Sequence, residues 1–124
     1  MALKHNFRKL TIWQEARKLV SETYKITSEF PNTEIYGFSN QMQRCSVSIA
    51  SNIAEGSARN SNKHFIQYLE TALGSSFEWE TQSICSFDLN YINEAVFEQN
   101  LEAIQKIQAM ISNFKNTLVF IINF

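Results

Sequence analysis

Little in this 124-residue chain breaks a helix, since it contains only three glycines and one proline. Strands and turns need more of this punctuation, so the scarcity favours long helices. No run approaches the ~20 apolar residues of a membrane span, and no apolar signal-peptide core follows the first basic residues. The two cysteines, Cys45 and Cys85, form no CxxC pair. These absences predict an all-α protein in the cytoplasm, away from membranes, where both thiols stay free.

Residues that carry chemistry are equally scarce. A metal site in a helical bundle needs inward-facing Glu and Glu-x-x-His sets, and the two isolated histidines, His5 and His64, do not supply them. Nucleophilic catalysis needs a base beside the nucleophile, and no histidine lies at helical spacing from a cysteine. We therefore expect no enzyme activity, no catalytic or metal-ligating residue, no cofactor and no small-molecule substrate. The alternative, an enzyme using Glu55 or Glu80, would need a deep pocket around a perturbed carboxylate.

Hydrophobic periodicity predicts four helices in one domain, residues 1–124. Ile12, Leu19 and Ile26 recur every seven residues, which is the pattern of a helix packed in a bundle. Two sevenfold rows mark the last helix. The first consists of Phe97, Ile104, Ile111 and Leu118, and its companion row consists of Ile107, Phe114 and Ile121. Short links between long helices are typical of an antiparallel up-down-up-down four-helix bundle. The predicted helices cover residues 11–30, 39–56, 61–89 and 95–121.

Two features bear on how these helices end and associate. Gly56 is expected to end the second helix in the left-handed conformation that glycine adopts freely, and Ser39 is expected to cap its start. The apolar positions of the third helix cover a wider arc than one ordinary amphipathic stripe. Together with ten phenylalanines, this arc predicts that the chain assembles as a homo-oligomer.

A polar row lies on the second helix, within the stretch 41–59. It consists of Arg44, Ser48, Asn52 and Glu55. Spacings of four, four and three place these side chains on one helix face. The row is either a structural polar layer or a site for a partner. In the first case Arg44 and Glu55 pair with Glu78, with Glu80 or with another subunit, because buried charges must be paired. The helical wheel places Glu80 on the apolar face of the third helix.

Charge is unevenly distributed along the chain. Residues 1–25 carry six basic side chains against two glutamates, whereas residues 61–90 carry one lysine against four acids. The residues expected to contact RNA or DNA are Arg8, Lys9, Arg17, Lys18 and Lys25. The alternative is an ordinary solvated helix face, and an overall pI near 6.1 lacks the strongly basic footprint of a dedicated nucleic-acid binder.

The order of several residues resembles the "four helix bundle protein" family. The resemblance covers roughly residues 7–118 and rests mainly on NIAEG, residues 52–56, and its flanks. The matching positions are Leu10, Trp13, Ala16, Phe30, Pro31, Glu34, Tyr36, Gly37, Gln41, Arg44, Ser48, Ile49, Arg59, Phe65, Leu69, Ala72, Gly74, Ser75 and Glu78. Family members include proteins encoded in intervening sequences of bacterial large-subunit ribosomal RNA genes, sometimes labelled ribosomal proteins. Accessory variability proteins of diversity-generating retroelements also belong to it.

The resemblance implies an all-helical protomer that forms a homopentamer without enzymatic activity. It adds Arg59 and Glu78 to the polar layer. Accessory variability members are basic, bind nucleic acid and contact a reverse transcriptase, so RNA, DNA or a nucleic-acid enzyme are the implied partners besides the chain itself. This sequence departs from them in its near-neutral charge and in Cys45, Ala50 and Asn60. The expected function is thus a non-enzymatic binding or scaffold role, with RNA binding as the alternative.

Overall fold

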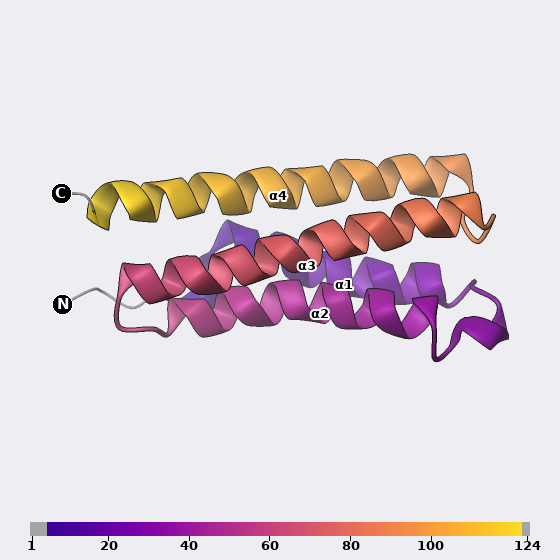
Figure 1. The fold of residues 1–124 in the computed structure, drawn as a ribbon, viewed down its shortest axis with the longest axis horizontal. Coiled ribbons are helices and arrows are strands. Elements are labelled where there is room, and N and C mark those ends of the chain that lie inside the picture. The colour runs from indigo at the N-terminus through magenta and orange to yellow at the C-terminus, as the bar shows by residue number, and fades with distance from the viewer. Residues whose placement is uncertain (1–4, 123–124) are drawn as a thin grey trace.

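The computed structural model describes residues 5–122, and within that range it contains four α-helices and no strand. The helices are α1 (Thr11–Thr27), α2 (Phe38–Ser57), α3 (Asn62–Asp88) and α4 (Glu94–Ile122). Two 3-10 turns, η1 (Phe7–Lys9) and η2 (Asn32–Glu34), precede α1 and α2. The long helices lie side by side along one axis (Figure 1). The expected all-α architecture with four helices is confirmed.

α1 ends three residues before the predicted position. The hydroxyls of Thr27 and Ser28 donate hydrogen bonds to carbonyls of their own helix, at 2.9 Å from Thr23 O and 2.6 Å from Lys25 O. Such bonds compete with the regular helical ladder. The next amides make tighter three-residue bonds, with Phe30 N–H donating to Thr27 O at 3.1 Å. The helix therefore closes in a tightened last turn before the proline.

The second helix differs from expectation at both ends. It begins at Phe38, whose N–H donates to the Glu34 carboxylate at 3.0 Å, so Glu34 caps it and Ser39 already lies inside it. Gly56 does not adopt a left-handed conformation; it is buried within the last turn of the helix. A Cβ built on Gly56 would lie 2.7 Å from Tyr68 Cβ and 2.8 Å from Phe65 Cδ1. Glycine is needed there because α3 approaches so closely.

A left-handed residue, which the sequence predicted at Gly56, occurs instead in the link between α3 and α4. Asn90 has φ 62°, a conformation that asparagine tolerates better than most residues. Its N–H donates to Phe87 O at 3.0 Å, and the next N–H, of Tyr91, donates to Ser86 O at 2.8 Å. This pair of bonds is a Schellman motif, which satisfies the last carbonyls of α3.

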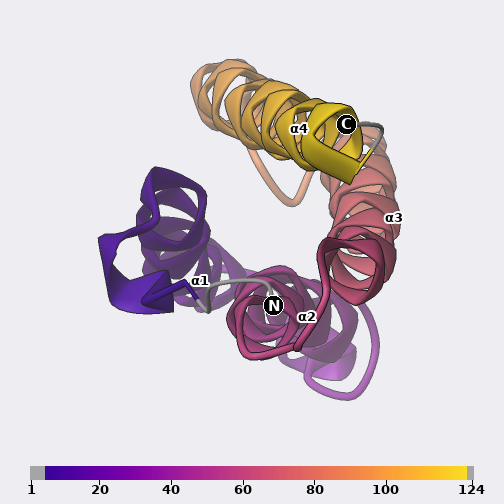
Figure 2. The same cartoon turned by 90° about the vertical axis from the view of Figure 1, so that its left-hand side faces the viewer.

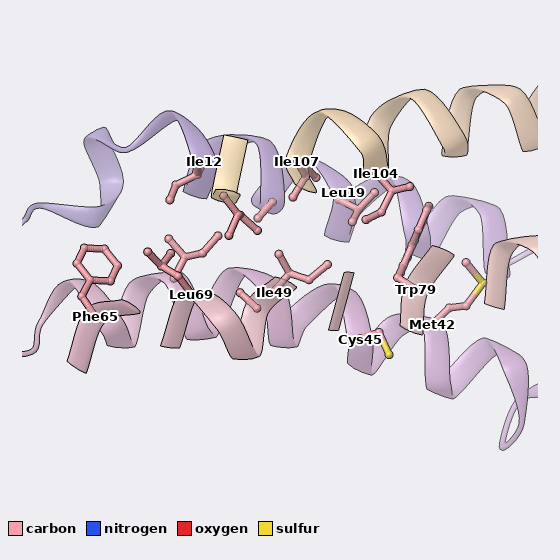
Figure 3. Packing of buried hydrophobic residues seen from close by; sticks show 14 of the residues in the cluster. Ile12, Leu19, Met42, Cys45, Ile49, Phe65, Leu69, Trp79, Ile104 and Ile107 are labelled. Carbon is pink, nitrogen blue, oxygen red and sulfur yellow. The ribbon is translucent and has the colours of Figure 1, made fainter. Parts of the chain in front are cut away.

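The core lies between the four helices. The side chain of Ile121 is outside the described residues, and the predicted heptad rows contribute Ile12, Leu19, Ile104, Ile107, Ile111 and Leu118 to the core. Figure 3 shows side chains converging from all four helices, among them Ile12, Leu19, Ile49, Leu69, Trp79, Ile104 and Ile107. Trp79 is 0% exposed, and its indole Nε1–H donates to Thr23 Oγ1 at 3.1 Å. This bond joins α3 to α1, so the core also contains a specific polar link that fixes how these two helices face each other.

The helices are not equally close around the bundle. In the end-on view, α2 lies beside α1 and α3, and α3 lies beside α4, whereas α1 and α4 stand apart (Figure 2). The edge between α1 and α4 is therefore the most open side of the bundle.

Candidate functional site

The middle of the predicted polar row lies in the seam between α2 and α3. Ser48 and Asn52 are half-buried there. The Ser48 and Ser75 hydroxyls share a hydrogen bond of 2.9 Å across the seam. Asn52 Nδ2 donates to Ser48 O at 2.8 Å and to Ser48 Oγ at 3.1 Å. These two residues thus form a small hydrogen-bonded layer between the helices.

The ends of the row are exposed and do not join this layer. Glu55 pairs at 3.0 Å with Arg59, which lies in the link after α2, and accepts a longer bond from the Tyr68 hydroxyl at 3.4 Å. The side chain of Arg44 forms no hydrogen bond or ion pair with any residue in the range 5–122. The expectation that they pair with Glu78 or Glu80 within the chain is wrong. Arg59, four residues on in the link after α2, lies within reach of the Glu55 carboxylate.

Glu78 and Glu80, the two acids of α3 that were expected to pair with the row, also lie apart. Glu80 is half-buried and accepts a hydrogen bond of 2.8 Å from Gln108 Nε2 on α4. Glu78 is exposed, and its Oε2 accepts from the Cys45 thiol at 3.5 Å. Burial, and then the negative charge of Glu78, raise the pKa of Cys45 above its ordinary value. The thiol is therefore held in its protonated form, as a hydrogen-bond donor and not as a nucleophile.

The expected nucleic-acid residues are all exposed, but they fall into two groups. Lys18 and Lys25 each pair with a glutamate three residues earlier, at 3.4 Å. Arg8 lies over the Phe7 ring at 4.6 Å and Arg17 over the Trp13 ring at 5.6 Å, and these two rings meet edge to face. Within the described residues neither arginine pairs with a carboxylate, and neither does the neighbouring lysine, Lys9.

Residues 5–122 contain no group of three or more His, Cys, Asp or Glu side chains that could hold a metal ion. None of the helices there is long and apolar enough to cross a bilayer.

One feature was missed at the level of sequence. A groove of about 460 Å³ lies between α1 and α4, and the nearly buried Asn100 is part of its lining. The companion row of α4 gives a readable signal for it, because the position seven residues before Ile107 is Asn100. A polar residue in an apolar heptad row marks a place where the core has a polar partner or an opening.

Comparisons with known proteins agree with the fold. A solved structure of a protein of unknown function from the S23 ribosomal protein family of Bacteroides thetaiotaomicron is similar, with a TM-score of 0.79 and 20% identity. The match covers 85% of this chain and 95% of that chain. No curated protein matches the chain. The family model of the 23S rRNA-intervening sequence protein matches residues 8–113. The chain belongs to the 23S rRNA-intervening sequence protein family.

Proposed function

We propose that the chain is the subunit of a non-enzymatic homo-oligomer, an antiparallel up-down-up-down bundle that serves as a binding or scaffold unit. The number of subunits, five, is carried over from the family resemblance. We assign this assembly to the cytoplasm, because the free thiols of Cys45 and Cys85 persist in a reducing compartment.

The outer face of α3 is the observation that carries this proposal. Phe77 is 52% exposed and Ile84 is 40% exposed, although α3 already packs against two neighbours. They lie seven residues apart, and Gly74, with nothing within 4 Å of a built Cβ, precedes Phe77 by three. These spacings put all three on one helix face. A row of exposed apolar side chains on a rigid helix is the kind of surface that a second subunit covers.

Two charged side chains without a partner in the described residues also support assembly into an oligomer. Arg44 on α2 has no carboxylate partner among residues 5–122, and Glu70 on α3 forms no ion pair there either. Both side chains are exposed. Opposite charges on different helices steer subunits together and fix their register. The proposal therefore gives Arg44 a partner across the subunit boundary, as one of the alternatives for the polar row requires.

Light scattering on the purified chain at micromolar concentration tests the assembly. We expect a mass several times that of one chain for the wild type, and a loss of assembly in the double variant Phe77→Gln/Ile84→Gln. The matched control is Tyr36→Gln, because Tyr36 is 92% exposed but lies in the link before α2. A monomeric wild type, or a double variant that assembles as well as the control, would refute the proposal.

The second candidate is nucleic-acid binding through the start of the chain. Arg8, Lys9 and Arg17 are exposed cations without a carboxylate partner in the described range, and two of them lie over aromatic rings. Cations beside aromatic faces can neutralise phosphates and stack on bases. Symmetry in an oligomer would repeat this patch and strengthen its field.

Retention of structured RNA at low and moderate salt tests this candidate. Binding should weaken as salt rises, and the double variant Arg8→Gln/Arg17→Gln should lose it. Lys25→Gln is the control, since the Lys25 ammonium is already paired with Glu22. RNA binding that is absent at low salt, or that responds equally to both variants, would remove nucleic acid as the ligand of this face.

A further inference from the structure

The open edge of the bundle contains a groove with an apolar lining. Leu19 and Ile26 line it from α1, and Val96, Ala103 and Ile107 line it from α4. Its volume is about 460 Å³. It lies where α1 and α4 stand apart in the end-on view (Figure 2). Leu19 and Ile107 form its buried floor, whereas Ile26, Val96 and Ala103 are half-buried and remain only partly covered.

Asn100 is a polar group held in the wall of this groove. Its side chain is only 4% exposed, and its Nδ2 donates to Ser83 Oγ at 2.9 Å. Its Oδ1 accepts no hydrogen bond from residues 5–122, but this oxygen is not fully shielded from solvent. Because Asn100 lines the groove, we infer that the oxygen is accessible from there. Leaving a nearly buried amide half-satisfied costs free energy. A ligand that offers a complementary polar group at this depth would recover that cost.

The spacing of the lining residues matches a helical occupant. Leu19 and Ile26 are seven residues apart, and so are Val96 and Ala103. Sevenfold rows on two adjacent helices form the holes into which the side chains of another helix pack. A buried asparagine in such a seam is the usual device that sets which residue of the partner lies opposite.

The charged rim of α1 repeats with the same period. Glu22 and Glu29 are seven residues apart, as are Lys18 and Lys25, and all four line the groove. Lys18 and Lys25 form exposed ion pairs with Glu15 and Glu22 that a partner helix would exchange for its own, whereas Glu29 forms no ion pair among residues 5–122. Charges at the edge of an apolar seam select the flanking charges of a partner helix. A small apolar ligand would make no use of this ladder, so the pattern favours a helix over a compact molecule.

An ion pair limits the length of the open part. Lys106 on α4 reaches across to Glu15 on α1 at 3.4 Å, and this bridge closes one end of the groove. On α4 the wall runs from Val96 to Ile107, which is about 16 Å at the helical rise of about 1.5 Å per residue. That is roughly three helical turns.

We propose that the α1–α4 groove binds one amphipathic helix of a partner protein. The helix is about three turns long, carries apolar residues at heptad spacing, and places one side-chain amide, Asn or Gln, opposite Asn100. Its flanks carry charges opposite to the alternating rim of α1. A side-chain amide both donates and accepts, so it can pair with whichever Asn100 amide atom faces the groove.

The test is selection of peptides on the full chain. A displayed library of peptides of about twelve residues, with fixed apolar heptad positions and all others randomised, covers the roughly three turns required. We expect enriched peptides to share an Asn or Gln at one central position. Synthetic copies should bind with micromolar affinity, and replacing that amide by Leu should weaken binding about tenfold, which corresponds to about 1.4 kcal/mol.

Matched variants of α4 locate the bound peptide. Ala103→Arg fills the groove, whereas Ala109→Arg places the same side chain on an exposed position of the same helix outside it. Gln99→Trp is a second groove variant at an exposed position, so the fold is expected to tolerate it. Peptide affinity should fall at least tenfold in both groove variants and stay unchanged in Ala109→Arg.

Three results would overturn the proposal. The first is a library without enriched peptides, and the second is enriched peptides that bind the groove variants as well as the wild type. The third is loss of self-association in Ala103→Arg but not in Ala109→Arg, which would make the groove an interface between copies of this chain. Failure of the assembly proposed above is a separate outcome, because Phe77→Gln/Ile84→Gln should leave peptide binding unchanged.

Discussion

Replacing glycine by alanine at two helical positions should change stability in opposite directions. Alanine is favoured over glycine inside a helix by about 0.5–1 kcal/mol, because glycine loses more backbone freedom on folding. A Cβ at Gly74 meets nothing within 4 Å in the single chain, so Gly74→Ala should realise this gain in the unassembled protein. The Cβ at Gly56 would lie 2.7 Å from Tyr68 Cβ and 2.8 Å from Phe65 Cδ1. Because Tyr68 Cβ is attached directly to the backbone of α3, the helices themselves must move apart.

The size of the Gly56→Ala effect follows from that clash. Overpacking a well-packed site costs roughly 1–3 kcal/mol, which exceeds the gain in helix propensity. We expect Gly56→Ala to destabilise the fold by about 1–2 kcal/mol, taking the gain into account. At about 4 °C per kcal/mol for a domain of this size, its Tm should fall by about 4–8 °C. Gly74→Ala should raise the Tm by about 2–4 °C on the same scale.

Thermal and urea unfolding followed by far-UV circular dichroism measure both effects. Each variant is measured at two protein concentrations, because assembly adds a stability that depends on concentration. The urea m-value should be unchanged, so that shifts in midpoint report stability. An alanine at Gly56 that stabilises as much as one at Gly74 would contradict the close approach of α2 and α3 at this point.

Three further changes test single interactions. Thr23→Val should cost about 1–3 kcal/mol in urea unfolding, because it keeps the shape of the side chain but leaves the buried Trp79 N–H without an acceptor. The raised pKa of Cys45 means that the folded state holds this proton more tightly than the unfolded state. Its stabilising contribution is therefore complete below pH 9.0 and is lost as pH rises from there through the folded pKa. Urea midpoints across this pH range should fall less steeply in Cys45→Ala, and an unchanged slope would contradict the assignment. Asn90→Val should cost about 1–2 kcal/mol because a β-branched residue resists positive φ, whereas Asn90→Gly should not destabilise; equal midpoints for both would argue against the Schellman turn.

The helices were predictable because their signals are local and periodic. The sevenfold row of α4 places Ile104 and Ile111 in the core, where both are fully buried. Capping was less predictable. A glycine at a helix end reads as a cap, but Gly56 is required by the approach of another helix, and a sequence pattern does not distinguish these two needs.

The candidate site was predictable only in parts. Ser48 and Asn52 do form a polar layer, because helical spacing brings them together on the face that meets α3. The ion pair between Glu55 and Arg59 was not predicted, although the two residues are only four positions apart in the sequence. Asn100 in the apolar companion row marks where the groove lies, but the size of the groove was not predictable, because it depends on how far α1 and α4 diverge. That distance is set by the summed sizes of core side chains, and no periodic pattern encodes it.

The open α1–α4 edge affects which helices open locally and exchange their amide hydrogens first. α1 and α4 are each supported mainly from one side, whereas α2 and α3 are held between two neighbours (Figure 2). Regions with fewer packed contacts open at lower free energy and exchange their amide hydrogens sooner. The pair α2–α3, joined by a short link and closely apposed at Gly56, is therefore the last unit to lose its protected amides. A partner that binds at the open edge is therefore expected to slow the amide exchange of α1 and α4 before that of α2 and α3.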